Sequence, residues 1–163
     1  MAAGDIPTLL GSETAPSITL NSLADGDAAV SAAISANISG SLYYPRYYFR
    51  LAISTNQSTA PDDDTLIGVY LSRYFNSAYD GGLSAGTNVT ADAGVETLER
   101  TLTPLKAVAV LGDGTSEVYT LSFVVDDPGP QFLIVVTNHT GQAFHSAAND
   151  LRYQTMLHQH QSS

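Results

Sequence analysis

The chain contains no cysteine and no tryptophan, and basic residues are scarce among its 163 residues. The absence of cysteine excludes disulfide bonds and thiolate metal sites. Six lysines and arginines stand against sixteen acidic residues, which gives a formal net charge of −10. This balance argues against binding along a nucleic-acid backbone, which requires clustered basic residues, and against binding to an anionic membrane surface.

Long apolar runs are also missing, the longest being FLIVV at residues 132–136. A transmembrane helix, which needs about 20 apolar residues, therefore does not fit. The N-terminal stretch has neither a basic start nor a long apolar segment, so we expect no signal peptide. Apolar residues still make up 44% of the chain and charged residues only 13%, which favours a single globular domain with neutral polar surfaces.

Alternation of apolar and polar side chains predicts β-strands along most of the chain. In YYFRLAIS, residues 47–54, one face is aromatic and aliphatic, whereas the other carries Tyr48 and Arg50. Residues 131–138 instead contain a continuous apolar run, as in a central strand that is buried on both faces. Strands are expected at residues 28–39, 47–54, 65–75, 106–111, 117–125, 131–138 and 151–156.

Turn signals separate these segments, and no helix is predicted. Asp113-Gly114 predicts a hairpin turn, and residues 76–94 read as a long surface loop. The pattern predicts an all-β protein, an antiparallel β-sandwich of jelly-roll type with about eight strands. We expect an extended N-terminal arm (1–16), which is either a disordered tail or a segment docked on a neighbouring subunit, then the sandwich domain (17–157) and a frayed tail (158–163).

Three motifs raise the question of chemistry. Ser84 lies in GLSAG, which matches the nucleophile elbow of hydrolases, but the buried strand before it and the helix after it are not predicted, so a flexible loop is the better interpretation. His158 and His160 could chelate a metal, although no third ligand is near in the sequence. Three aspartates at 62–64 could bind calcium, yet a solvated loop tip is favoured. A tyrosine-rich face could also stack sugars.

The segment SLYYPRYYFRLAIS, residues 41–54, concentrates tyrosines and arginines in an otherwise acidic chain. Tyr and Arg carry much of the binding energy at protein interfaces, so we predict that this strand presents a contact face. The alternative is that these residues only fill the core or meet solvent. The predicted interface residues are Tyr43, Tyr44, Arg46, Tyr48 and Arg50, together with Ile6, Leu9 and Leu10 of the arm, which would cross onto a neighbouring subunit.

The C-terminal segment QFLIVVTNHTGQAFHSAANDLRYQTM resembles a pattern found in small virion proteins of tailed bacteriophages. In that pattern an apolar strand ends in Asn-x-Thr-Gly, continues through small residues to Asn-x-Leu, and finishes on a strand with Tyr. The preceding DDPGPQF and the upstream strands extend the resemblance to roughly residues 28–156. The matching positions are Asn138, Thr140, Gly141, Ala147, Asn149, Leu151 and Tyr153.

The resemblance implies a non-enzymatic jelly-roll protein of the phage particle, best a decoration (cement) protein on the capsid surface. A tail, collar or fibre component, or a carbohydrate-binding module for host attachment, is the alternative. The implied partners are the major capsid protein and further copies of the chain, as a homotrimer, without cofactor, metal, nucleic acid or membrane. Such a protein is made in the host bacterial cytoplasm, a reducing compartment that suits a chain without cysteine.

Overall fold

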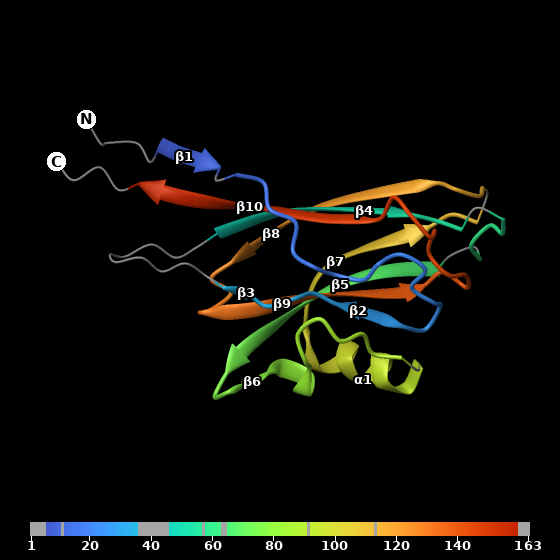
Figure 1. Cartoon of the computed structure of the whole chain (residues 1–163), viewed down its shortest axis with the longest axis horizontal. Coiled ribbons are helices and arrows are strands. Elements are labelled where there is room, and N and C mark those ends of the chain that lie inside the picture. Colours follow the sequence, from blue (N-terminus) through green and yellow to red (C-terminus); the bar gives the residue numbers. More distant parts are fainter. Residues whose placement is uncertain are drawn as a thin grey trace.

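The computed structural model describes residues 6–10, 12–35, 46–56, 58–62, 65–90, 92–112 and 114–159. They form two antiparallel sheets that face each other (Figure 1). The first sheet has four strands in the order β1-β10-β4-β8. Its strands are β1 (Ile6–Leu10), β4 (Arg46–Ser54), β8 (Val118–Asp126) and β10 (Asp150–Gln159).

The second sheet has six strands, with β2-β9-β5-β6 along its main path. In addition, β3 pairs with β9 and β7 pairs with β5. The expected all-β, antiparallel sandwich is confirmed. The strands of this sheet are β2 (Ala28–Val30), β3 (Ile34–Ser35), β5 (Thr65–Phe75), β6 (Ala78–Tyr79), β7 (Thr103–Val110) and β9 (Gln131–His139).

The main core lies between the sheets, and β4 supplies much of it. Its inward side chains alternate with outward ones, as the sequence predicts, and Phe49 is fully buried. The Phe49 ring stacks on the ring of Phe123 of β8, with 5.1 Å between the ring centroids. The Tyr47 ring meets Phe132 of β9 edge to face, with 5.0 Å between the centroids. Burying one such side chain contributes about 1.5–3 kcal/mol, so this aromatic set ties the two layers together.

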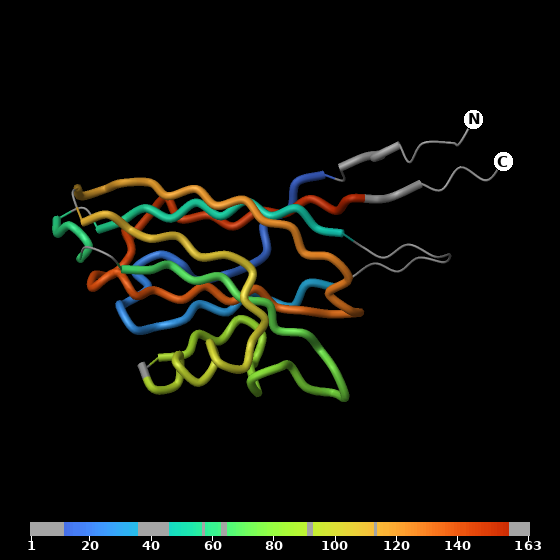
Figure 2. The backbone as a smooth tube through the Cα atoms, turned by 180° about the vertical axis from the view of Figure 1, so that it is seen from behind, coloured from blue at the N-terminus to red at the C-terminus, as the bar shows by residue number. Residues whose placement is uncertain are grey.

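A second apolar cluster covers the outer face of the six-stranded sheet. It forms between β9 and the helix α1 (Asp92–Thr101), which lies against this sheet alone (Figure 2). Leu133 and Val135 point into it, so β9 is buried on both faces as predicted. The expectation that the chain has no helix is wrong, because residues 92–101 form α1, which turns Val95 and Leu98 toward the sheet, together with Leu102 directly after it. Within the described residues, no helix is long and apolar enough to cross a bilayer.

Most connections cross from one sheet to the other instead of forming hairpins. The hairpin predicted at Asp113-Gly114 is wrong, because β7 pairs with β5 whereas β8 pairs with β4. Both strands point an apolar side into the core, but from opposite sheets, so the chain crosses from one sheet to the other between them. Asp113 itself lies outside the described residues.

The strand predicted over residues 28–39 is interrupted. Between β2 and β3 the hydroxyl of Ser31 accepts a hydrogen bond from the Ile134 N–H (3.0 Å), and the Ser31 N–H donates to the Ile134 carbonyl (3.0 Å). The side chain thus replaces a backbone acceptor in the ladder, and pairing resumes at Ile34. Residues 36–39 lie outside the described part of the chain.

Candidate functional site

The two sheets differ in what covers their outer faces. Helix α1 packs on the six-stranded sheet, whereas the outward side chains of β4 and β8 in the four-stranded sheet are exposed or half-exposed. We call this outer surface the open face. Its central residues are Arg46, Tyr48 and Arg50 on β4, Ser122, Val124 and Asp126 on β8, and Arg152, Gln154 and Met156 on β10.

Strand register arranges the open face in cross-strand rows, with β4 in the middle. Arg46 stands between Met156 and Asp126. Tyr48 stands between Gln154 and Val124 in the next row. The third row places Arg50 between Arg152 and Ser122.

The apolar part of the open face centres on Tyr48 and Val124. Their side chains are 38% and 43% exposed, and they are direct cross-strand neighbours. Val118, at the start of β8, is 62% exposed. Half of the six large hydrophobic side chains that are exposed in the described residues therefore lie on this one face, where no described element of the chain covers them.

The basic residues gather on the same face. Arg46, Arg50 and Arg152 make up half of the six basic residues of the chain. Arg46 forms an ion pair with Asp126. Arg152 binds Asp150 at 2.5 Å (Nε to Oδ2) and Glu13 at 3.6 Å, and the hydrogen bond and charge of the Asp150 carboxylate raise the pKa of Arg152.

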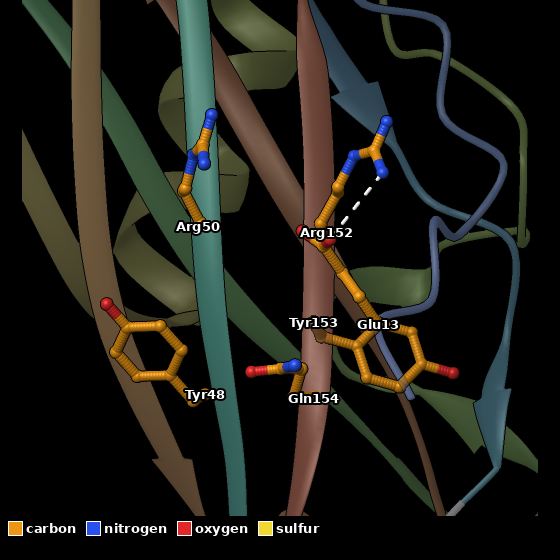
Figure 3. A pocket seen from close by; sticks show the side chains of 6 residues that line it. All are labelled: Glu13, Tyr48, Arg50, Arg152, Tyr153 and Gln154. Atoms are coloured by element: carbon orange, nitrogen blue, oxygen red, sulfur yellow. Dashed lines mark ion pairs between the residues drawn. The ribbon is translucent and has the colours of Figure 1, made fainter. Parts of the chain in front are cut away.

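A groove of about 320 Å³ opens between β4 and β10 on this face (Figure 3). Arg50 and Arg152 lie on neighbouring strands at one end of it, and Glu13 reaches Arg152 from the N-terminal segment. Tyr153 packs its ring against Phe49 (5.4 Å), so it joins the groove to the core. The six lining residues are Glu13, Tyr48, Arg50, Arg152, Tyr153 and Gln154.

The structure brings three of the predicted interface residues, Arg46, Tyr48 and Arg50, onto this face. Tyr43 and Tyr44 lie outside the described residues. Sequence reasoning missed the contributions of β8 and β10. A strand is expected at residues 151–156, and period-two alternation puts Arg152 and Gln154 on one side of it, but this pattern does not show that the strand pairs with β4.

The predicted arm residues Ile6, Leu9 and Leu10 belong to β1, which pairs with β10 of the same chain. In the register Ile6 faces Gln159 and Leu10 faces Met156, with an irregularity between Thr8 and Leu10. The structure therefore shows this part of the arm as an edge strand of the four-stranded sheet.

The remaining candidates do not converge on a site. Ser84 is exposed in a loop, after a short 3-10 turn (Asp80–Gly82) and well before α1. His158 belongs to β10, whereas His160 and two of the three aspartates lie outside the described residues. Across the residues that the structure describes, no group of three or more His, Asp or Glu side chains is placed to hold a metal ion.

No protein-family model matches the chain, and no curated protein matches it. The function is therefore argued from the strand order and from the open face.

Proposed function

We propose that the protein is a non-enzymatic decoration protein of a tailed-phage particle, which binds the outer capsid surface through the open face. The observation that carries the proposal is the asymmetry of the sandwich. One sheet is covered by its own helix, whereas the other presents an uncovered strip of Tyr48 and Val124 flanked by arginines. An apolar centre with a polar rim is the arrangement that protein interfaces use.

The strand order supports a jelly roll as the architecture. If β2 and β3 count as one strand and the two-residue β6 is set aside, eight strands remain. In chain order, the first, eighth, third and sixth form one sheet, and the second, seventh, fourth and fifth form the other. This is the double Greek-key order of a jelly roll, a fold common in viral capsid proteins and lectins.

The charges are consistent with a contact between proteins. The formal charge of −10 keeps the protein soluble and repels nucleic acid, while the arginines of the open face offset the acids there. A single contact centred on two half-exposed apolar side chains, Tyr48 and Val124, is modest in affinity. Assembly as a homotrimer would let several faces engage major capsid proteins at once, so that modest contacts add up.

Binding to particles tests the proposal. The purified protein is mixed with particles of the encoding phage that lack it, and bound protein is measured by cosedimentation. We expect saturable binding, and an about tenfold weaker affinity when Tyr48 and Val124 are both replaced by Ser. Phe75→Ser is the matched control, because Phe75 is 81% exposed but belongs to the other sheet.

Two outcomes would overturn the proposal. If the wild-type protein does not bind particles at all, the decoration role is wrong. If the double variant keeps its circular dichroism spectrum and binds as well as the wild type, the open face is not the contact surface.

A carbohydrate-binding module is the second candidate, because the groove combines tyrosine and glutamine side chains and lectins also use jelly rolls. Glycan-array binding, followed by a titration monitored through tyrosine fluorescence, separates the two functions. Saturable sugar binding by the isolated protein, without binding to particles, would favour the module.

A further inference from the structure

Arg50 and Arg152 form a cross-strand pair of like charges on the open face. They are direct partners in the β4–β10 register. Like charges directly opposite one another destabilise a sheet unless counter-charges relieve them. Both acids that lie at this pair, Asp150 and Glu13, are bound to Arg152.

Arg50 differs from the other described arginines because, within the described residues, its side chain has neither an ion pair nor a hydrogen bond. Arg46 and Arg100 are paired with carboxylates, and Arg73 donates to Thr103 Oγ1 at 3.0 Å. Among the described residues, Arg50 has no ion pair, although the chain has sixteen acids for six basic residues. Its guanidinium is exposed at the groove, where a counter-ion can reach it from outside the chain.

The other groups at the groove favour an anion with oxygen acceptors. Tyr48 and Gln154, which form the neighbouring cross-strand row, also line the groove with a hydroxyl and an amide, and the one acid in the lining, Glu13, is bound to Arg152. A guanidinium presents its N–H donors in a planar fork that matches the two oxygens of a carboxylate. A polyanion such as nucleic acid is disfavoured by the strongly negative net charge, whereas a single carboxylate is not.

We infer that Arg50 is an anion-binding residue that takes the carboxylate of an Asp or Glu side chain from the protein partner. The inference rests on the proposed function, because it names the chemistry that the open face would recognise. The carboxylate supplies the counter-charge that Arg50 lacks, and Gln154, which reaches from β10 toward β4, offers it an amide N–H (Figure 3).

Substitution of Arg50 tests the inference on particles. We expect Arg50→Ala to weaken binding about tenfold or more, because truncating one partner of a buried charge pair is costly. Arg50→Lys should recover only part of the loss, since lysine keeps the charge but not the fork. Arg100→Ala, on α1, is the matched control and should bind like the wild type.

A second measurement needs no particle. Short oligoglutamate and oligoglutamine peptides are titrated into the labelled protein, and the arginine Nε–H resonances are followed by NMR. Oligoglutamate should shift the Arg50 resonance at low salt and lose this effect at high salt, and oligoglutamine should not shift it.

The two failures can be told apart. If Arg50→Ala binds particles like the wild type while the Tyr48 and Val124 double variant does not, the carboxylate inference is wrong and the proposed function stands. If oligoglutamate shifts the Arg50 resonance but no variant affects particle binding, the anion site is real and the proposed contact surface is wrong. If Arg50→Ala binds particles like the wild type and oligoglutamate does not shift the Arg50 resonance, the inference is overturned.

Discussion

The carboxylate of Glu99 on α1 and the ring of His139 on β9 lie 2.8 Å apart, Oε1 to Nε2. The same oxygen accepts a hydrogen bond from Thr137 Oγ1 at 2.8 Å. Both partners come from β9, so one side chain of the helix is bound twice to the central strand of the six-stranded sheet. Close approach of the backbone at Gly68 makes room for this cluster, because a Cβ there would lie 2.6 Å from Thr137 Oγ1.

We expect Glu99→Ala to destabilise the fold by about 1–3 kcal/mol, because the fully buried Thr137 loses its acceptor on the helix. Urea unfolding followed by circular dichroism measures the change. Glu96→Ala on the same helix is the control, since Glu96 forms only an exposed pair with Arg100 and should cost less than about 0.5 kcal/mol. Equal effects of the two substitutions would show that the contact with β9 does not anchor α1.

The buried Tyr47 and the half-buried Tyr70 lead us to expect a loss of stability at high pH. Burial raises the pKa of Tyr47 to about 12, and burial together with the nearby Glu99 raises the pKa of Tyr70 to about 12. An unfolded tyrosine ionises near pH 10, so the unfolded state releases these protons first. The contribution of both residues is complete below about pH 10 and is lost as the pH rises from there to about 12.

Tyrosinate absorbance and urea unfolding at several pH values check this prediction. At least two of the nine tyrosines should ionise late, and Tyr70→Phe should flatten the decline of unfolding free energy above about pH 10. A single early ionisation of all nine tyrosines in the folded protein would contradict it.

Asn138 holds the corner between β9 and β10. Its amide donates to the carbonyls of Leu23 and Gln142, both at 2.9 Å, and its Oδ1 accepts from the N–H (3.1 Å) and hydroxyl (2.8 Å) of Thr140. We expect Asn138→Ala to cost about 3 kcal/mol, because several buried polar groups lose their partners together. Asn56→Ala, which removes one exposed bond to the Ser58 N–H (2.8 Å), should change stability by about 0.5 kcal/mol or less in the same thermal or urea unfolding experiment.

Deleting residues 2–12 removes β1. Thr14 would keep both backbone hydrogen bonds to Tyr153 (2.9 Å each), and the core residues from Leu20 onward would all remain, so we expect the sandwich to stay folded. The last residues of β10 would lose their strand partner, which leaves an open edge. Occupancy on particles should fall while the circular dichroism spectrum is kept, and unchanged occupancy would refute a role for the arm in binding.

The sequence predicts the layers of this fold well where burial is decided locally. Alternation separated Phe49 from Arg50, and the apolar run in β9 indicated burial on both faces. The resemblance residues Asn138, Thr140 and Asn149 are explained by the corners they stabilise; for example, Asn149 Oδ1 accepts from the Ser54 N–H at 2.7 Å. These positions define architecture, which is why they point to a fold more directly than to a chemistry.

The errors arose where distant partners decide the outcome. Helix α1 carries only Val95 and Leu98 as apolar contacts, with Leu102 directly after it, and its Gly and Thr residues obscured that spacing within a polar stretch. The Asp113-Gly114 signal describes a tight turn but not which sheet each flanking strand will join. The open face depends on the register of β10 with β4. This register pairs residues that are about a hundred positions apart along the chain, so a local sequence pattern does not reveal it.

The pairing of Ile6 with Gln159 brings the two ends of the described chain to one corner of the molecule, where β1 lies beside β10 (Figure 1). A guest peptide joined to either end would leave the fold from the same place, beside the four-stranded sheet. A short tether between the ends could equally close the polypeptide into a ring, and new ends could then be cut at an exposed site such as the turn after Phe75, giving a rearranged chain order for the same sandwich.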